Sequence, residues 1–188
     1  ISEHRLRHAD GHYVWVADRG KVVTRDDEGR ARRVVGSMRN IDELKRNEEE
    51  RFRLAFFDPL TGLPNRRLLL DRLQQALAVK QRTQDFGALM FLDMDHFKEL
   101  NDTHGHAMGD ALLTTVADRL RQSVRHEDTV SRFGGDEFVV LVSRLGTDPD
   151  AALKDATAIA EKLLATLNQP YQLGSLTYPS TPSIGLTL

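Results

Sequence analysis

The stretch Arg132-Phe133-Gly134-Gly135-Asp136-Glu137-Phe138-Val139-Val140-Leu141-Val142 decides how the rest of the chain is interpreted. Strand-forming residues on both sides of a glycine pair predict a β-hairpin, with strands over 129–133 and 136–142. Glycine lets the backbone turn tightly and leaves the turn bare, so a large ligand can approach the main chain. Asp136 and Glu137 follow the glycines directly. Because like charges repel, two adjacent carboxylates are costly for stability alone, and a divalent cation with a phosphate ligand would explain them.

A second acidic segment strengthens this interpretation. Ala88–Leu92 is a short apolar run with the length of a buried strand, and it ends in Asp93-Met94-Asp95. A strand that delivers Asp93 beside the hairpin carboxylates predicts an all-oxygen site for Mg²⁺. A Gly-Gly-Asp-Glu string alone would instead favour an ordinary hairpin with its acidic side chains in water.

The overall composition limits the classes of function. The 188 residues carry a formal charge of −2, which gives no reason to expect a nucleic-acid partner. There is no cysteine, so disulfides and thiolate metal sites are excluded. No apolar stretch reaches the roughly 18 residues of a membrane span, so we expect no membrane contact within this segment and a cytoplasmic location. The first residue is Ile1, so we expect an excerpt of a longer protein, and an upstream membrane anchor remains an open alternative.

Residues 1–40 predict an antiparallel meander, with strands at 3–7, at 12–17 with a β-forming continuation at 21–24, and at 31–38, and with turns at Asp10-Gly11 and 26–29. Three strands cannot enclose a core of their own, so the meander is either a β-extension of the main domain or part of a larger domain. Residues 41–57 are highly charged and predict a helix. Their apolar positions make a poor heptad seam, which leaves a solvated linker helix and a dimeric coiled coil as alternatives.

The rest of the chain alternates helices and strands. Apolar periodicity predicts helices at about 66–80, 110–125 and 149–168, a shorter one at 96–102, and strands at 87–93, 171–178 and 183–188. This order indicates an α+β fold with a ferredoxin-like βαββαβ core.

Several segments together resemble the GGDEF family of diguanylate cyclases. They are Asp58-Pro59-Leu60-Thr61-Gly62-Leu63-Pro64-Asn65-Arg66, the run from Asp93 to Asp102, Gly105-His106-Ala107-Met108-Gly109-Asp110, the pentapeptide Gly134–Phe138 and Ser183-Ile184-Gly185. Residues 1–40 are similar to the C-terminal half of a PAS sensor domain. The resemblance implies a partial PAS domain at 1–40, a signalling helix at 41–57 and a nucleotide-cyclase-like GGDEF domain at 58–188.

The resemblance also implies a reaction. Such a domain condenses two GTP molecules into cyclic di-GMP and releases pyrophosphate, under control of the sensor domain and of its own product. One domain holds one GTP, so we expect an active homodimer. The family continues after the Ser-Ile-Gly strand with a Lys and an Arg that bind phosphates, so we expect residues 1–188 alone to cyclise GTP poorly.

The family assigns roles to residues at both acidic segments. Asp93, the Met94 carbonyl and Asp136 are the expected ligands of Mg²⁺, with Mn²⁺ as an alternative. Asp136 is also the expected catalytic proton acceptor, and Glu137 is a supporting carboxylate at the metal.

The implied substrate site lies mostly between the acidic segments. Asn101 and Asp110 are expected to bind guanine, and Phe97, Lys98, Gly134 and Gly135 are expected to lie against the phosphates. Judged alone, Asp110 fits a helix N-cap and Asn101 a turn residue.

Arg125 and Asp128 match the RxxD inhibitory site, where cyclic di-GMP binds and stops turnover. Arginine can form paired hydrogen bonds with a phosphate, and aspartate can accept from guanine. The alternative is a surface ion pair, which would contribute little to stability.

Two other functions are alternatives to the cyclase. A catalytically silent domain would bind GTP or cyclic di-GMP as a regulator, possibly ahead of a phosphodiesterase domain. A pure dimerisation and relay module would leave the carboxylates unexplained. A zinc site is not expected at His96, His104, His106 and His126, because their spacing matches no known ligand set.

Overall fold

The computed structural model describes all residues, 1–188, and divides them into two compact units, Ile1–Arg53 and Leu54–Leu188. The first unit contains β1 (Ser2–Arg7), β2 (Tyr13–Arg25) and β3 (Ala31–Asn40) in one antiparallel sheet of order β1-β2-β3. Helix α1 (Asp42–Phe56) follows, and the boundary between the units falls within it. The predicted meander is therefore confirmed, and β2 joins the two predicted β-forming segments at 12–17 and 21–24 into one strand.

The first unit has almost no core. Val16 and Ile41 are its only buried hydrophobic residues, whereas Val34, Val35 and Met38 on β3 are each more than half exposed. Helix α1 buries no residue at all. The first residue of α1 is attached to β2, because Asp42 accepts a hydrogen bond of 2.7 Å from the Trp15 amide. The unit therefore depends on strand pairing more than on apolar burial.

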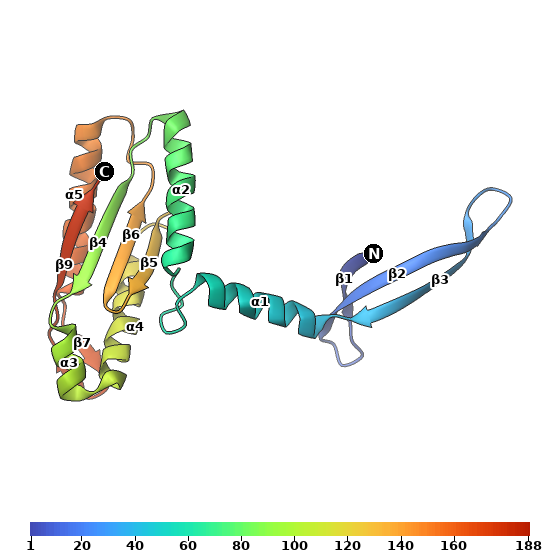
Figure 1. The fold of residues 1–188 in the computed structure, drawn as a ribbon, viewed down its shortest axis with the longest axis horizontal. Helices are drawn as coiled ribbons and strands as arrows, with labels where there is room; N and C mark the ends of the chain where they lie inside the picture. Colours follow the sequence, from blue (N-terminus) through green and yellow to red (C-terminus); the bar gives the residue numbers. More distant parts are fainter. The chain divides into compact units, whose positions relative to one another are not determined.

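The second unit is built on a four-stranded antiparallel sheet of order β5-β6-β4-β9 (Figure 1). Its strands are β4 (Ala88–Met94), β5 (Thr129–Gly134), β6 (Glu137–Val142) and β9 (Pro182–Thr187). Helices α3 (Phe97–His104) and α4 (His106–Ser123) connect β4 to β5, and α5 (Pro149–Leu167) follows β6. This order of elements confirms the predicted α+β fold with its ferredoxin-like core.

Helices cover both faces of this sheet. The main core joins α4 and α5 to one face through residues such as Leu112, Leu163 and Met90. On the other face, Leu69 of α2 (Arg66–Thr83) packs on Val139 and Leu141 of β6. Alternate residues along β4 and β6 therefore face different layers. None of the helices has both the length and the apolar character needed to cross a bilayer.

Three predicted elements differ from the structure at their ends. Helix α4 begins at His106, four residues before the predicted start, because Gly105 with φ of 84° allows the chain to turn from α3 directly into α4. Helix α2 continues to Thr83. The predicted strand at 171–178 is a short hairpin of β7 (Tyr171–Leu173) and β8 (Leu176–Tyr178).

Candidate active site

The hairpin turn consists of Gly135 and Asp136, since Gly134 of β5 pairs with Glu137 of β6. The expectation that both glycines form the turn is thus wrong in detail, because Gly134 ends the strand. Gly135 has φ of 51°, a conformation that glycine adopts readily. A two-residue turn fixes Asp136 at the tip of the hairpin, next to Glu137.

Strand β4 brings Asp93 to the same place. Asp93 pairs with Glu137 on β6 and with Ser183 on β9, although these residues are 44 and 90 positions away in the sequence. The three residues line a cavity of ≈ 370 Å³ together with Phe91 and Gly185. The sheet therefore gathers Asp93, Asp136 and Glu137 at one end of its central strands.

The electrostatics of this cluster are unfavourable without a counter-ion. Partial burial, and then the negative charges of Asp136, Glu137 and Asp95, raise the pKa of the Asp93 carboxyl above its usual value. The carboxylate oxygens of Asp93, Asp136 and Glu137 do not all lie within 4.8 Å of one another. A group of three ligand atoms that meets this distance occurs elsewhere in the chain. Carboxylates and a backbone carbonyl are hard oxygen donors, which fits Mg²⁺ or Mn²⁺.

Asp95, two residues further on, has a different role. Its carboxylate accepts hydrogen bonds from Thr181 Oγ1 (2.7 Å) and Ser183 Oγ (2.9 Å), and these lower its pKa. Its amide also donates to the Thr181 carbonyl at 2.8 Å. Asp95 therefore fastens the start of β9 to β4, whereas the Met94 side chain between the two aspartates is buried.

The predicted guanine-binding residues lie on α3 and α4. Asn101 is in the last turn of α3, and its Oδ1 is buried without a hydrogen-bond partner. Gly109 makes room for it, because a Cβ at that position would stand 2.1 Å from Asn101 Oδ1. An unsatisfied buried amide oxygen is costly, so this site is suited to a ligand that donates a hydrogen bond.

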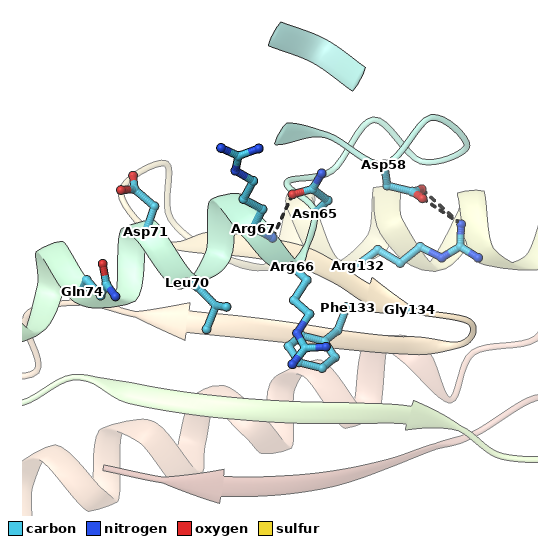
Figure 2. Close-up of a pocket in the computed structure, with 10 residues that line it drawn as sticks. All are labelled: Asp58, Asn65, Arg66, Arg67, Leu70, Asp71, Gln74, Arg132, Phe133 and Gly134. Carbon is cyan, nitrogen blue, oxygen red and sulfur yellow. Dashed lines mark hydrogen bonds and ion pairs between the residues drawn. The ribbon is translucent and has the colours of Figure 1, made fainter. Parts of the chain in front are cut away.

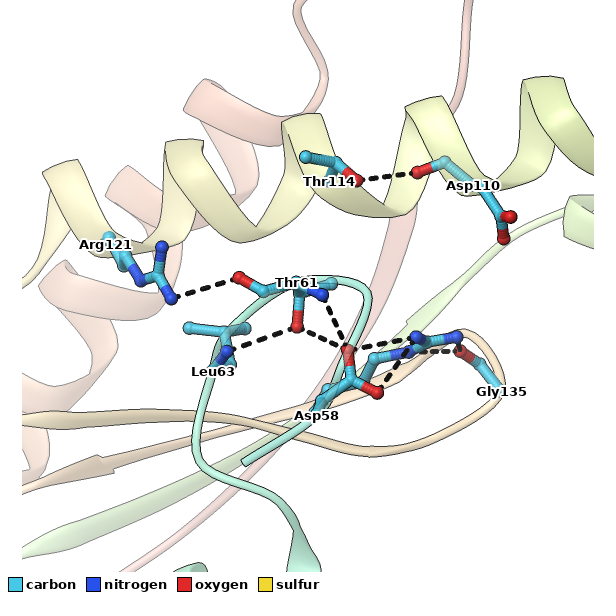
Figure 3. A network of polar contacts seen from close by, with 8 residues as sticks. Asp58, Thr61, Leu63, Asp110, Thr114, Arg121 and Gly135 are labelled. Atoms are coloured by element: carbon cyan, nitrogen blue, oxygen red, sulfur yellow. Dashed lines mark hydrogen bonds and ion pairs between the residues drawn. The ribbon is translucent and has the colours of Figure 1, made fainter. Parts of the chain in front are cut away.

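Asp110 is exposed in the second turn of α4, so the alternative of a helix N-cap is wrong. Gly105 holds the N-cap position. Figure 3 shows that the backbone carbonyl of Asp110 accepts from Thr114 Oγ1, at 2.9 Å, and that the carboxylate takes no part in this contact. The side chain is therefore available to a ligand.

Phe97 and Lys98 form the first turn of α3. The residue before them, His96, is in the left-handed region with φ of 60° and gives no side-chain cap. The Phe97 ring packs against the main core, and Lys98 is exposed. The amides of this turn are thus without a capping side chain, and a positive charge stands beside them.

Arg125 and Asp128 lie in the turn before β5. Asp128 accepts from the Arg125 amide at 3.1 Å and from the Ser143 amide at 3.2 Å, so its carboxylate is held by the main chain. The Arg125 guanidinium is exposed and reaches only Glu127, at 4.0 Å. Arg125 and Asp128 thus form no ion pair with each other, and Arg125 instead takes part in a long surface ion pair with Glu127.

Arg132 links the hairpin turn to the segment before α2, a contact that the sequence did not predict. Arg132 donates through Nη1 to both oxygens of Asp58 at 3.1 and 3.2 Å (Figure 2). It also donates through Nε and Nη2 to the Gly135 carbonyl. Asp58 also accepts from the amide and hydroxyl of Thr61, as Figure 3 shows. Asp58 and Arg132 are 74 residues apart, and nothing in the sequence indicates that they pair.

A larger pocket of ≈ 640 Å³ lies between α2 and the end of β5. Figure 2 shows Arg66 against the ring of Phe133, and its guanidinium carbon stands 4.7 Å from the ring centroid. Arg67, Arg132 and Gly134 also line the pocket. This pocket therefore has a mixed lining, in which Arg66 and Arg67 stand with Asp71 and the Arg132–Asp58 pair.

Taken together, the fold and the site define an α+β nucleotide-cyclase-like domain with an acidic cluster at the end of its sheet. The family described as "Diguanylate cyclase, GGDEF domain" matches residues 55–188, and the PAS fold matches residues 1–38. The chain belongs to the GGDEF diguanylate cyclase family.

Known relatives agree with this assignment. The chain is 45% identical over 145 residues to the bifunctional diguanylate cyclase/cyclic di-GMP phosphodiesterase MucR of Pseudomonas aeruginosa, covering 77% of this chain and 20% of MucR. The solved GGDEF domain of TpbB from the same organism aligns with a TM-score of 0.65 at 39% identity, covering 69% of this chain and 73% of that one. The coiled coil and GGDEF domain of DgcB from Caulobacter crescentus, in complex with c-di-GMP, aligns with a TM-score of 0.67 at 29% identity over 78% of this chain and 75% of that one. The chain thus spans only about a fifth of the length of MucR.

Proposed function

We propose that the protein containing this chain is an active diguanylate cyclase, which condenses two GTP molecules into cyclic di-GMP and pyrophosphate. The observation that carries the proposal is the pairing of Asp93 with Glu137 beside Asp136. These side chains raise the pKa of Asp93 and have no cation of the chain's own among them. A purely structural domain has no use for this repulsion.

In the proposed site, Asp93, Asp136 and the Met94 carbonyl hold the metal ion, with Glu137 in support. A bound Mg²⁺ or Mn²⁺ supplies charge neutralisation on the triphosphate and activation of the attacking hydroxyl. Asp136 accepts the proton of the 3′-hydroxyl that attacks the α-phosphorus. The two-residue turn holds Asp136 for this role, and the Arg132–Asp58 contact fixes the turn.

Asn101 and Asp110 provide the proposed selectivity for guanine. The buried Asn101 Oδ1 accepts a hydrogen bond that a base must donate, and the free Asp110 carboxylate accepts from the N1 and N2 hydrogens of guanine. The amides of the Phe97–Lys98 turn, the Lys98 ammonium and the open backbone of Gly134 and Gly135 lie against the phosphates in this proposal. Because one such domain holds one GTP and the reaction joins two, the proposed condensation requires a homodimer.

The full-length protein with Mg²⁺ and GTP tests this function directly. The proposal expects cyclic di-GMP and pyrophosphate, detected by chromatography and a coupled phosphate assay. Binding of GTP without turnover would favour the alternative of a catalytically silent regulatory domain. If the protein neither bound GTP nor turned it over, both the cyclase and the silent regulatory domain would be contradicted.

Product inhibition is a separate part of the proposal, at Arg125 and Asp128. The Arg125 guanidinium is exposed and would exchange only its 4.0 Å contact with Glu127 for a phosphate, and Asp128 is held in place by two amides. Arg125→Ala should therefore relieve inhibition by added cyclic di-GMP by about tenfold or more, the effect of one charge-assisted contact, without changing the KM for GTP. Unchanged inhibition would remove this site from the proposal, and the cyclase activity would stand.

A further inference from the structure

The first unit carries a cluster of metal-ligating side chains that the cyclase reaction does not use. His8, Asp10 and His12 surround the turn between β1 and β2, and their ligand atoms all lie within 4.8 Å of one another. No other group of three such residues in the chain meets this criterion. In the sequence this segment predicts only a turn, because alternate residues of a hairpin loop give no helical or zinc-finger spacing.

The backbone holds the three residues in position. The His8 amide donates to the His12 carbonyl at 2.7 Å, and the Gly11 amide donates to the His8 carbonyl at 3.0 Å. Gly11 has φ of 99°, so the turn depends on glycine at this position. Ligands at positions i, i+2 and i+4 are thus brought to one side of a short, closed turn.

Both imidazoles point to one carboxylate oxygen. His8 Nδ1 lies 3.1 Å from Asp10 Oδ1, His12 Nδ1 also contacts that oxygen, and the two rings stack with their centroids 4.7 Å apart. Adjacent ligands of a tetrahedral zinc ion stand roughly 3.3 Å apart, given metal–ligand bonds of about 2.0–2.1 Å. The His8–Asp10 separation is close to this value, and all three ligand atoms lie within 4.8 Å of one another, so small side-chain movements would place them around one ion.

The Asp10 carboxylate is exposed and also accepts a hydrogen bond from the His12 amide at 3.2 Å. The guanidinium of Arg7 opposes a cation, since it lies 3.8 Å from the position a Cβ on Gly11 would take.

We propose that His8, Asp10 and His12 form a surface site for one borderline transition-metal ion such as Zn²⁺, separate from the magnesium site of the cyclase domain. Two imidazole nitrogens and one carboxylate favour Zn²⁺, Cu²⁺ or Ni²⁺ over Mg²⁺, which prefers oxygen donors throughout. The ion fastens the start of β2 to the end of β1 and keeps open positions for water. In a unit with only two buried hydrophobic residues, this link would stabilise the hairpin.

Calorimetric titration of the full chain with Zn²⁺, in excess Mg²⁺ to occupy oxygen sites, tests the proposal. His8→Ala and His12→Ala should each weaken one binding event by at least about tenfold, the smallest loss seen when even an outer partner of a metal ligand is removed. Arg7→Ala should tighten the same event. His4→Ala and His126→Ala are matched controls and should leave it unchanged, as should the double variant Asp93→Asn/Asp136→Asn.

Equal zinc affinity in the wild type and both His variants would overturn the site, as would loss of binding in the Asp93/Asp136 double variant alone. A second measurement needs no variant at all. The electron paramagnetic resonance spectrum of the wild-type chain with one equivalent of Cu²⁺ should show two coordinated imidazole nitrogens, and fewer than two would contradict the proposal.

Discussion

Asp58 and Asp93 both lie close to the Gly135–Asp136 turn, but their carboxylates have opposite surroundings. Burial acts to raise the pKa of Asp58, yet hydrogen bonds from Thr61 and Arg132 outweigh it and hold the pKa below its usual value. Burial also raises the pKa of Asp93, and the charges of Asp136, Glu137 and Asp95 raise it further. One acidic group is thus fully paired within the protein, and the other stands among like charges. The first builds the hairpin, and the second is kept for a ligand.

The largest expected effect separates the two roles through Asp136. Asp136→Asn should lower GTP turnover by about 10²–10⁴-fold, because it removes the proposed proton acceptor and a metal ligand, while the melting temperature stays the same or rises. Turnover and circular dichroism of the full-length protein measure both effects. Asp155→Asn, an exposed substitution on α5, is the control. A turnover close to that of the wild type would break the distinction between the two carboxylates.

The paired carboxylate should behave in the reverse manner. Arg132→Met should destabilise the second unit by about 1–3 kcal/mol, because it leaves Asp58 and the Gly135 carbonyl without their shared donor. Denaturant unfolding measures this loss, and Arg82→Met on the exposed face of α2 should have no effect.

The pH dependence gives the same comparison a sign. A carboxylate with a lowered folded pKa contributes stability that is complete above its unfolded value of 3.8 and is lost as the pH falls below it. The wild type should therefore lose stability more steeply below that pH than Arg132→Met does. Parallel acid-unfolding curves would show that the pair contributes nothing.

A smaller effect tests the buried acceptor on α3. Gly109→Ala should raise the KM for GTP by about tenfold, the value of one hydrogen bond, because the new methyl group displaces the Asn101 amide. Helix propensity alone would make this substitution favourable. In an Asn101→Ala background it should add nothing, since both changes remove the same contact. Additive effects would contradict this explanation.

The smallest expected effect is a gain in stability at Asp93. Its folded pKa is raised, so the stability of the folded chain decreases as the pH rises through the interval just above 3.8. Asp93→Asn removes this loss and should stabilise the unit at pH 7 by well under about 1 kcal/mol, because the group is exposed and its charge is screened. Added Mg²⁺ should raise the melting temperature of the wild type but not of Asp93→Asn.

Local sequence patterns were enough to predict the helices and strands, but they did not predict contacts between residues that are distant in the sequence. The apolar run Ala88–Leu92 was enough to predict a buried strand ending in Asp93, because alternation and length are local properties. The start of α4 was misplaced because Gly105 and Gly109 look like loop residues in sequence. In the structure, Gly105 turns the chain and Gly109 lies buried inside the helix.

The same limit applies to the site. The two acidic segments were enough to predict that Asp93, Asp136 and Glu137 gather, and the resemblance to a known family supplied their separate roles. Their position at one sheet end follows from strand pairing. The contacts of Arg132 with Asp58, and of Asp95 with Thr181 and Ser183, join residues 74 to 88 positions apart. No spacing within one segment encodes such pairs, and only the folded chain brings them together.

The two-residue turn at Gly135–Asp136 makes the site sensitive to chain length. Gly134 and Glu137 are already paired, so one additional codon between them would move the aspartate away from its partners while leaving the β5–β6 ladder in place. In the proposed cyclase, a single inserted residue in this turn would therefore stop cyclic di-GMP synthesis and leave the domain folded. One mutation could thus convert an enzyme of this kind into a domain that only binds its ligand.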